Sequence, residues 1–294
     1  MSIVMKRHGL FLTITANLIW GTMFVATGVG LRYTNPYNLV FLRFATASLL
    51  IVVIAIVTRR VVLLAKELAS TMIWVLGGIY ALGFVFQYVG QDFANASDAT
   101  LLANLAPTLV PLIAVVVLRD SLGNAQKMAT ILGLAGLVFI AAPKLSLGSG
   151  TIAGDFLLLG TSVCYAVFIV LSKRYRVASS ASAFAIILSI SVFLAPVATF
   201  LGGLNYASLN FGWVGWCSVL YMGIPGSVLA VALYLKGLSL VTVSQSGTLL
   251  LVQLLTGLFL AVLILSEFPT SFEIAGAISI VVAVVLSTSG IRGN

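Results

Sequence analysis

Hydrophobic residues occur along this chain in long continuous runs, and short polar stretches separate one run from the next. The runs do not alternate apolar with polar residues, so the pattern favours helices over strands. Each run has about 20 residues, the length that crosses the hydrocarbon core of a bilayer. Because a segment in lipid must satisfy its own backbone, the pattern predicts an all-α membrane protein. Ten spans are expected, at residues 10–30, 37–57, 72–93, 96–118, 125–142, 152–171, 181–202, 213–235, 243–265 and 272–289.

The second half of the chain repeats the order of segments in the first half, which predicts two five-helix repeats at 1–147 and 148–294. A shift by half the chain superposes Gly90 on Gly237, Ser97 on Ser244 and Asp120 on Glu267. Since five is odd, the second repeat would enter the membrane from the opposite side. Inverted repeats are typical of secondary transporters, whose binding site lies near mid-membrane between the repeats.

Composition and charge agree with a membrane protein. Of 294 residues, 61% are hydrophobic and 7% are charged, against about 25% charged in soluble domains. The net charge of +8 could indicate nucleic-acid binding, but its distribution follows the positive-inside rule instead. With both termini in the cytoplasm of a bacterial inner membrane, only Arg32 and Lys144 fall on the outer side. The inner side collects Lys6, Arg7, Arg59, Arg60, Lys66, Arg119, Lys127, Lys173, Arg174, Arg176, Lys236 and Arg292.

Several chemistries lack the residues they need. The chain has no Gly-rich phosphate loop ending in Lys-Ser or Lys-Thr, which argues against ATP-driven pumping. Its one histidine, His8, lies at the cytoplasmic edge, and its two cysteines lie inside spans without a metal-ligand spacing. Carboxylates are missing from the centres of the spans. We therefore expect neither an enzyme nor a metal or other cofactor, and no nucleic-acid partner.

Several strings resemble a known family. They are Ala16-Asn17-Leu18-Ile19-Trp20-Gly21, then Pro36, Phe41-Leu42-Arg43-Phe44, the stretch from Ala96 to Pro107 and the acidic turn at Asp120. In this order they resemble the EamA-type branch of the drug/metabolite transporter superfamily, and within it the chain is similar to bacterial aromatic amino acid exporters. The resemblance implies ten helices in inverted repeats and export of small metabolites. The chain departs from the family at Asp120, where many relatives have Glu, and at Leu254, where the counterpart of Pro107 is lost.

Arg43 is the one basic residue well inside a span, about 10 Å from its outer end at about 1.5 Å per residue. A charge at this depth is costly unless it faces the interior, a partner or water. It could anchor a substrate carboxylate, which a guanidinium binds through two hydrogen bonds. The alternative is a structural arginine that pairs with Asp92 or Asp98, or one that reaches outward to the surface. The sequence alone slightly favours this alternative.

Other polar and aromatic residues predict the wall of a cavity. Tyr80, Phe84, Gln87 and Gln91 recur at steps of three and four, which places them on one helical face. The alternative for this stripe is hydrogen bonding between helices, worth about 1 kcal/mol each in a bilayer. Prolines at 107 and 111 predict a kinked helix with freed carbonyls, or only tolerated packing. Further candidates for the substrate site are Asn17, Trp20, Asn104, Pro107, Thr108, Tyr165, Ser227, Tyr234, Gln245 and Gln253.

The combined expectation is a secondary transporter that exports small metabolites, most often amino acids, by alternating access. A neutral, aromatic cavity suits a small zwitterion such as an aromatic amino acid. Alternatives are a broad drug/metabolite exporter and, from another class, a passive channel or a structural membrane subunit. The expected partners are a small-molecule substrate and the lipid bilayer, and a monomer would suffice.

Overall fold

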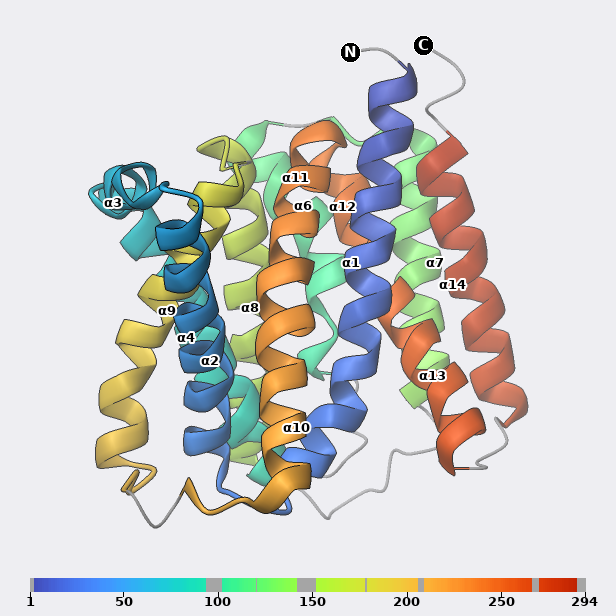
Figure 1. Cartoon of the computed structure of the whole chain (residues 1–294). Coiled ribbons are helices and arrows are strands. Elements are labelled where there is room, and N and C mark those ends of the chain that lie inside the picture. The colour runs from blue at the N-terminus through green and yellow to red at the C-terminus, as the bar shows by residue number, and fades with distance from the viewer. Residues whose placement is uncertain are drawn as a thin grey trace.

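The computed structural model describes residues 3–93, 102–119, 121–141, 152–177, 179–205, 209–265 and 270–289, and the regular elements in these ranges are all helices (Figure 1). In chain order they are α1 (Ile3–Gly30), α2 (Pro36–Val57), α3 (Val61–Leu68), α4 (Thr71–Phe93), α6 (Ala106–Leu118), α7 (Asn124–Ala141), α8 (Ile152–Arg174), α9 (Ser180–Phe200), α10 (Gly212–Gly223), the π-helix η3 (Ile224–Leu229), α11 (Ala230–Leu240), α12 (Val243–Leu249), α13 (Val252–Leu265) and α14 (Ser271–Ser289). The all-helical prediction is confirmed.

Six helical stretches in the described part are long and apolar enough to cross a membrane. They are α1, α2, α4, α8, α9 and the rod formed by α10, η3 and α11. The other predicted spans correspond to the shorter or interrupted helices α6, α7, α12 with α13, and α14, so the count of ten spans stays a prediction. The boundary predicted at 147/148 lies outside the described residues.

The packing of the helices follows the repeat. A shift by half the chain places α1 on α8, α2 on α9, α4 on η3 and α11, and α7 on α14. The contacts follow the same correspondence. Helix α1 packs on α11, and their counterparts α8 and α4 pack on each other. Helices α2 and α9 pack on each other, and so do α7 and α14. The main interfaces therefore join the first half to the second, and the first turn of α1 and the last turn of α14 lie at the same end of the bundle (Figure 1).

Two of the predicted spans are broken, which corrects the expectation of continuous helices. In the fourth span the helix stops before Leu105, and α6 starts at Ala106 with Pro107 in its first turn. Proline suits this position because it has no N–H to leave unpaired there. Pro107 thus begins a new helix rather than kinking a continuous one. In the ninth span α12 ends at Leu249 and α13 begins at Val252, a break at the position equivalent to the first.

The eighth predicted span contains a third irregularity. Between α10 and α11 the backbone widens into η3, and the N–H of Ala230 donates to the carbonyl of Pro225. Because Pro225 lacks an N–H, the α-helical bond to the preceding turn cannot form there, and the π-helical register accommodates the loss. Short π-helical segments inside α-helices occur often at functional sites.

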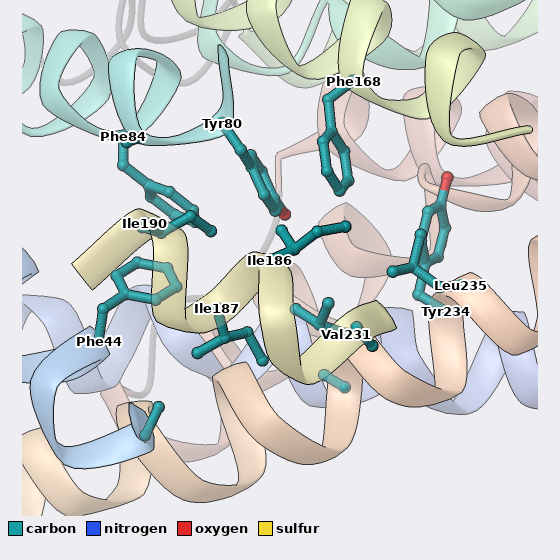
Figure 2. Close-up of a cluster of buried hydrophobic side chains, with 14 of the residues drawn as sticks. Phe44, Tyr80, Phe84, Phe168, Ile186, Ile187, Ile190, Val231, Tyr234 and Leu235 are labelled. Atoms are coloured by element: carbon teal, nitrogen blue, oxygen red, sulfur yellow. The ribbon is translucent and has the colours of Figure 1, made fainter. Parts of the chain in front are cut away.

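The core lies where helices from both halves meet. In Figure 2 the aromatic side chains of α2, α4 and α8 lie around α9. The residues labelled there are Phe44, Tyr80, Phe84, Phe168, Ile186, Ile187, Ile190, Val231, Tyr234 and Leu235, and all are buried. Large apolar side chains such as Phe11, Phe156 and Phe200 face outward instead. A continuous apolar exterior is unusual for a soluble protein and is expected for helices that contact lipid.

Close approach of α1 and α11 depends on Gly237. A Cβ added at this position would lie 2.9 Å from the carbonyl oxygen of Gly9 and 2.9 Å from the amide nitrogen of Thr13. At Gly28, which belongs to α1, an added Cβ meets no atom within 4 Å. We predict that Gly237→Ala lowers stability by about 1–3 kcal/mol through overpacking. Gly28→Ala should leave stability unchanged or raise it, because alanine favours the helix. Thermal melting in detergent compares the two variants, and equal melting temperatures would contradict close helix contact at Gly237.

Candidate functional site

A cavity of about 250 Å³ lies between the two halves at the level of Arg43. The first half contributes side chains from α1, α2 and α4, and the second half contributes side chains from α8 and α11. The two interrupted spans also line the cavity, the fourth through Asn104 and Ala106 and the ninth through Leu250 and Gln253. Interrupted helices at equivalent places in two repeats are a recurrent feature of transporter binding sites.

Arg43 is the only charged residue among the described residues that line the cavity. Its side chain is 5% exposed, and its Nε donates to Ser227 Oγ at 2.9 Å. Its Nη2 donates to the Gly226 carbonyl oxygen at 3.4 Å. The guanidinium carbon lies 5.2 Å from the ring centre of Phe44 and 5.0 Å from that of Phe84. Among the described residues Arg43 therefore has aromatic and neutral partners but no carboxylate partner.

This geometry excludes one of the roles that the sequence leaves open for Arg43. Arg43 does not reach outward to the surface, so that interpretation was wrong. The proposed pairing with Asp92 or Asp98 lies outside the described residues, since the structure describes neither Asp98 nor the side chain of Asp92. The charge is stabilised here by two ring faces and two hydrogen bonds.

The π-helix η3 supplies the acceptors that hold Arg43. The Gly226 carbonyl accepts from both Arg43 and the indole Nε1 of Trp20, the latter at 3.0 Å. Ser227 is fully buried, and its hydroxyl donates to the Met222 carbonyl at 3.0 Å while it accepts from Arg43. A side chain on η3 at Gly226 would collide with Met23 of α1. The irregular turn therefore links α1 and α2 of the first half to the second half.

Aromatic rings form one wall of the cavity. Tyr80 and Phe168 stack with centroids 4.1 Å apart and an interplanar angle of 17°. Tyr165 meets Tyr80 edge-on at 5.1 Å, and Phe84 lies 4.8 Å from Tyr80 (Figure 2 shows Phe84, Tyr80 and Phe168). Offset and edge-to-face contacts of this kind add about 0.5–1.5 kcal/mol per pair beyond burial. The wall is thus a packed surface suited to a flat apolar group.

Neutral polar groups complete the lining. The Tyr165 hydroxyl donates to Gln87 Oε1 at 2.6 Å, and Gln253 Nε2 donates to Asn104 Oδ1 at 3.3 Å. The second pair joins the two interrupted spans. Tyr88 is 3% exposed, and within the described chain its hydroxyl has no hydrogen-bond partner. A buried hydroxyl without a partner costs about 1–3 kcal/mol, so Tyr88 offers a hydrogen bond to an occupant of the cavity.

The structure brings most of the predicted site residues together. Those that line the cavity are Trp20, Arg43, Tyr80, Phe84, Gln87, Asn104, Tyr165, Tyr234 and Gln253. Five others lie elsewhere: Asn17, Pro107, Thr108, Ser227 and Gln245. Whether any of these residues binds substrate stays a prediction.

The residues outside the lining have local roles that the sequence did not reveal. Asn17 Nδ2 donates to the Thr13 carbonyl within α1. Gln245 belongs to a capping box with Thr242 at the start of α12, and its Nε2 donates to the Ser287 carbonyl of α14. Pro107 and Thr108 lie in the first turn of α6, where a proline fits the helix start. Ser227 lies behind Arg43 and acts on the cavity only through it.

Two aromatic lining residues, Tyr88 and Phe168, were missed by the sequence analysis. Tyr88 follows Tyr80 and Phe84 at steps of four, so the periodicity that identified the stripe could have included it. Phe168 lies three residues after Tyr165 and shares its helical face. Both were overlooked because aromatic residues in an apolar span resemble ordinary core residues. The described residues contain no group of His, Cys, Asp and Glu that could hold a metal ion.

The cavity extends toward the end of the bundle at which α1 and α4 finish. Thr27, Gly28 and Leu31 line it in the last turns of α1 and just beyond, and Gln91 lines it in the last turn of α4. At the end that carries the start of α1, Lys173 Nζ donates to the carbonyls of Leu238 and Val241, each at 2.6 Å. Arg174 Nη1 donates to the Val117 carbonyl at 3.2 Å. Cations at helix C-termini are stabilised by unpaired carbonyls, so α8 ties α6 and α11 together at this end.

Comparison with known proteins shows the family to which this chain belongs. A relative from Archaeoglobus fulgidus, described as an uncharacterized transporter, is 30% identical over 97% of this chain and 98% of its own length. YyaM of Bacillus subtilis, also described as an uncharacterized transporter, is 21% identical over 98% of this chain and 96% of its own length. A crystal structure that is 20% identical superposes over 97% of this chain and 98% of its own with a TM-score of 0.83, which shows a shared fold. The model of the EamA-like transporter family matches residues 7–142 and again 152–289. The resemblance drawn from the sequence is thereby confirmed: the chain belongs to the EamA-like transporter family.

Proposed function

We propose that this transporter exports small carboxylate-bearing metabolites, most often neutral or aromatic amino acids, across the bacterial inner membrane. One observation carries the proposal. The buried guanidinium of Arg43 lines a cavity between the repeats, and among the described residues no carboxylate neutralises it. A buried cation with unused donors attracts an anion, and its planar fork fits a carboxylate.

The remaining donors of Arg43 set how a carboxylate would bind. Nε is engaged by Ser227, and Nη2 makes a long bond of 3.4 Å to the Gly226 carbonyl. The two terminal nitrogens therefore remain for an end-on, two-bond contact with a carboxylate. Gln87, Tyr88 and Asn104 are neutral polar neighbours in the same lining and can meet an amino group or its hydrogen-bonded water.

Size and wall chemistry support a small substrate. Drug-sized ligands occupy sites of roughly 300–1,000 Å³, whereas this cavity has about 250 Å³. The stacked rings of Tyr80 and Phe168 suit an aromatic or other apolar side chain. A broad exporter of cationic drugs would be expected to place a carboxylate in the cavity, and the described lining has none.

Alternating access accounts for the shape of the cavity. It extends to the ends of α1 and α4, while Lys173 and Arg174 hold the opposite end together. Rocking of one repeat against the other would break these contacts and open that end. A passive channel needs a continuous path, so a cavity closed at one end favours a carrier. The basic residues at the closed end favour its location in the cytoplasm.

We predict that Arg43→Gln weakens the binding of amino acids much more than that of their amides or decarboxylated analogues. A buried hydrogen bond to a charged group contributes about 1.5–3 kcal/mol, so the loss should be roughly tenfold or more in affinity. Counterflow of labelled substrate in proteoliposomes measures it. Arg32→Gln is the matched control, because Arg32 is basic but does not line the cavity. Equal losses for acids and amides, together with a lower melting temperature, would assign Arg43 a purely structural role.

We predict that Tyr88→Phe reduces transport without reducing stability. The substitution removes a hydroxyl that bonds no described residue, so it breaks no hydrogen bond within the described part of the chain. A neutral hydrogen bond to substrate contributes about 0.5–1.5 kcal/mol, equivalent to a two- to tenfold loss of affinity. Tyr165→Phe is the comparison, because it breaks the bond to Gln87 and should lower the melting temperature as well. Unchanged counterflow for Tyr88→Phe would remove this residue from the site.

The predicted orientation can be tested with a chain in which Cys164 and Cys217 are replaced by serine. A cysteine introduced at Arg32, between α1 and α2, should react with an impermeant maleimide added outside intact cells. A cysteine at Ser70, between α3 and α4, should react only after the cells are opened. The opposite result, or reaction at both positions in intact cells, would overturn the cytoplasmic placement of the termini.

A further inference from the structure

A second cleft, of about 290 Å³, lies at the end of the bundle that carries the termini, away from the cavity between the halves (Figure 1). The end of α2, the helix α3 and the start of α9 enclose it. Its wall is mainly apolar and includes Ile54, Ala55, Leu63, Leu64 and Phe184. Arg60 is the one basic residue that lines the cleft among the described residues.

Helix α3 lies across the ends of the spanning helices, and Figure 1 shows it nearly end-on beside the upright α2. Leu64 packs into the protein, but Val61, Val62 and Leu63 are 49%, 82% and 44% exposed. A short helix that exposes aliphatic side chains at the end of membrane spans is stable where acyl chains cover it. The apolar face of α3 therefore requires an apolar neighbour that this chain does not supply in its described part.

The segment from Arg59 to Glu67 contains three basic residues and one acidic residue. Arg59, Arg60 and Lys66 are exposed, and within the described chain the side chain of none of them forms a hydrogen bond or an ion pair. The one acidic residue, Glu67, is engaged, because its Oε2 accepts from the Ser182 hydroxyl at 2.9 Å. Glu67 also lines the cleft, so three basic residues and one carboxylate leave this segment with a net positive charge.

The turn that presents these cations is built around Arg59. Its φ is +55°, a left-handed conformation that glycine usually occupies at the end of a helix. The N–H of Arg60 reaches back to the Ala55 carbonyl at 2.8 Å, and that of Arg59 to Ile56 at 3.0 Å, which closes the end of α2. This turn directs α3 away from α2 and places Arg59 and Arg60 just beyond the end of a helix long and apolar enough to cross a membrane.

From these observations we infer that the cleft between α2, α3 and α9 binds an anionic phospholipid. The acyl chains cover Val61, Val62 and Leu63 and enter the apolar cleft, and the phosphate lies against Arg60 with Arg59 and Lys66 nearby. An apolar peptide would leave the cations unpaired, and a soluble anion would leave the valines exposed to water. A lipid with a negative headgroup satisfies both requirements through charge and apolar complementarity.

The test uses the full-length protein purified in detergent and given equal amounts of phosphatidylglycerol and phosphatidylcholine with identical chains. Native mass spectrometry counts the lipid that stays bound. Phosphatidylglycerol should be retained in preference, and a variant with Arg59→Asn and Arg60→Gln should lose that preference by about tenfold or more, since each cation near the surface contributes about fivefold. Asparagine is chosen because it tolerates the positive φ at this position.

Lys236→Gln is the matched control, because it removes one exposed charge from the same end of the bundle away from the cleft. This control variant should still retain phosphatidylglycerol in preference to phosphatidylcholine. If the double variant does not fold, Lys66→Gln, on the exposed side of α3, replaces it with a smaller expected loss. Equal retention of the two lipids, an equal loss in Lys236→Gln, or competition by glycerol phosphate without acyl chains would each overturn the proposal.

Discussion

The guanidinium of Arg43 lies away from water on a helix that crosses hydrocarbon, and a charge there is stable only where the protein surrounds it with suitable groups. Two aromatic faces and the oxygens of Ser227 and Gly226 meet this need. The aromatic faces come from α2 and α4 and the oxygens from η3. One buried cation thus fixes how the two repeats meet, and the widened turn of η3, the close approach at Gly226 and the position of Trp20 all depend on this junction.

The interrupted helices follow from a related constraint. Backbone that leaves the helical path in a membrane is stable only where it borders protein or a cavity. Both breaks border the cavity between the halves, and the bond between Gln253 and Asn104 joins them. The substrate cavity and the helix breaks therefore occur together, and the continuous helices α1 and α8 pack on the interrupted helices.

The sequence predicted the helical class, the repeat and about half of the residues that line the cavity, because apolar runs and steps of three and four residues are local signals. It predicted a kink at Pro107, but not that the helix would stop before it. The second break, at Leu250, has no proline, and Gly247 in the turn before it is only a weak sequence signal for a break. Helix α3 was missed because its eight residues are too few for a span. The hydrogen-bond partners of Arg43 lie more than 180 residues away along the chain, and no local pattern could identify them.

The contacts of Lys173 introduce an asymmetry between two otherwise equivalent halves. In the first repeat the positions equivalent to Lys173 and Arg174 are Ala26 and Thr27, which carry no charge. In the proposed exchange of conformations between the repeats, no lysine at the position equivalent to Lys173 can therefore close the opposite end as Lys173 closes this one. In the proposed alternating-access cycle, the two end states would then differ in free energy, and the empty carrier would favour the state closed at the Lys173 end. Substrate contacts in the cavity would have to supply the free energy that populates the other state.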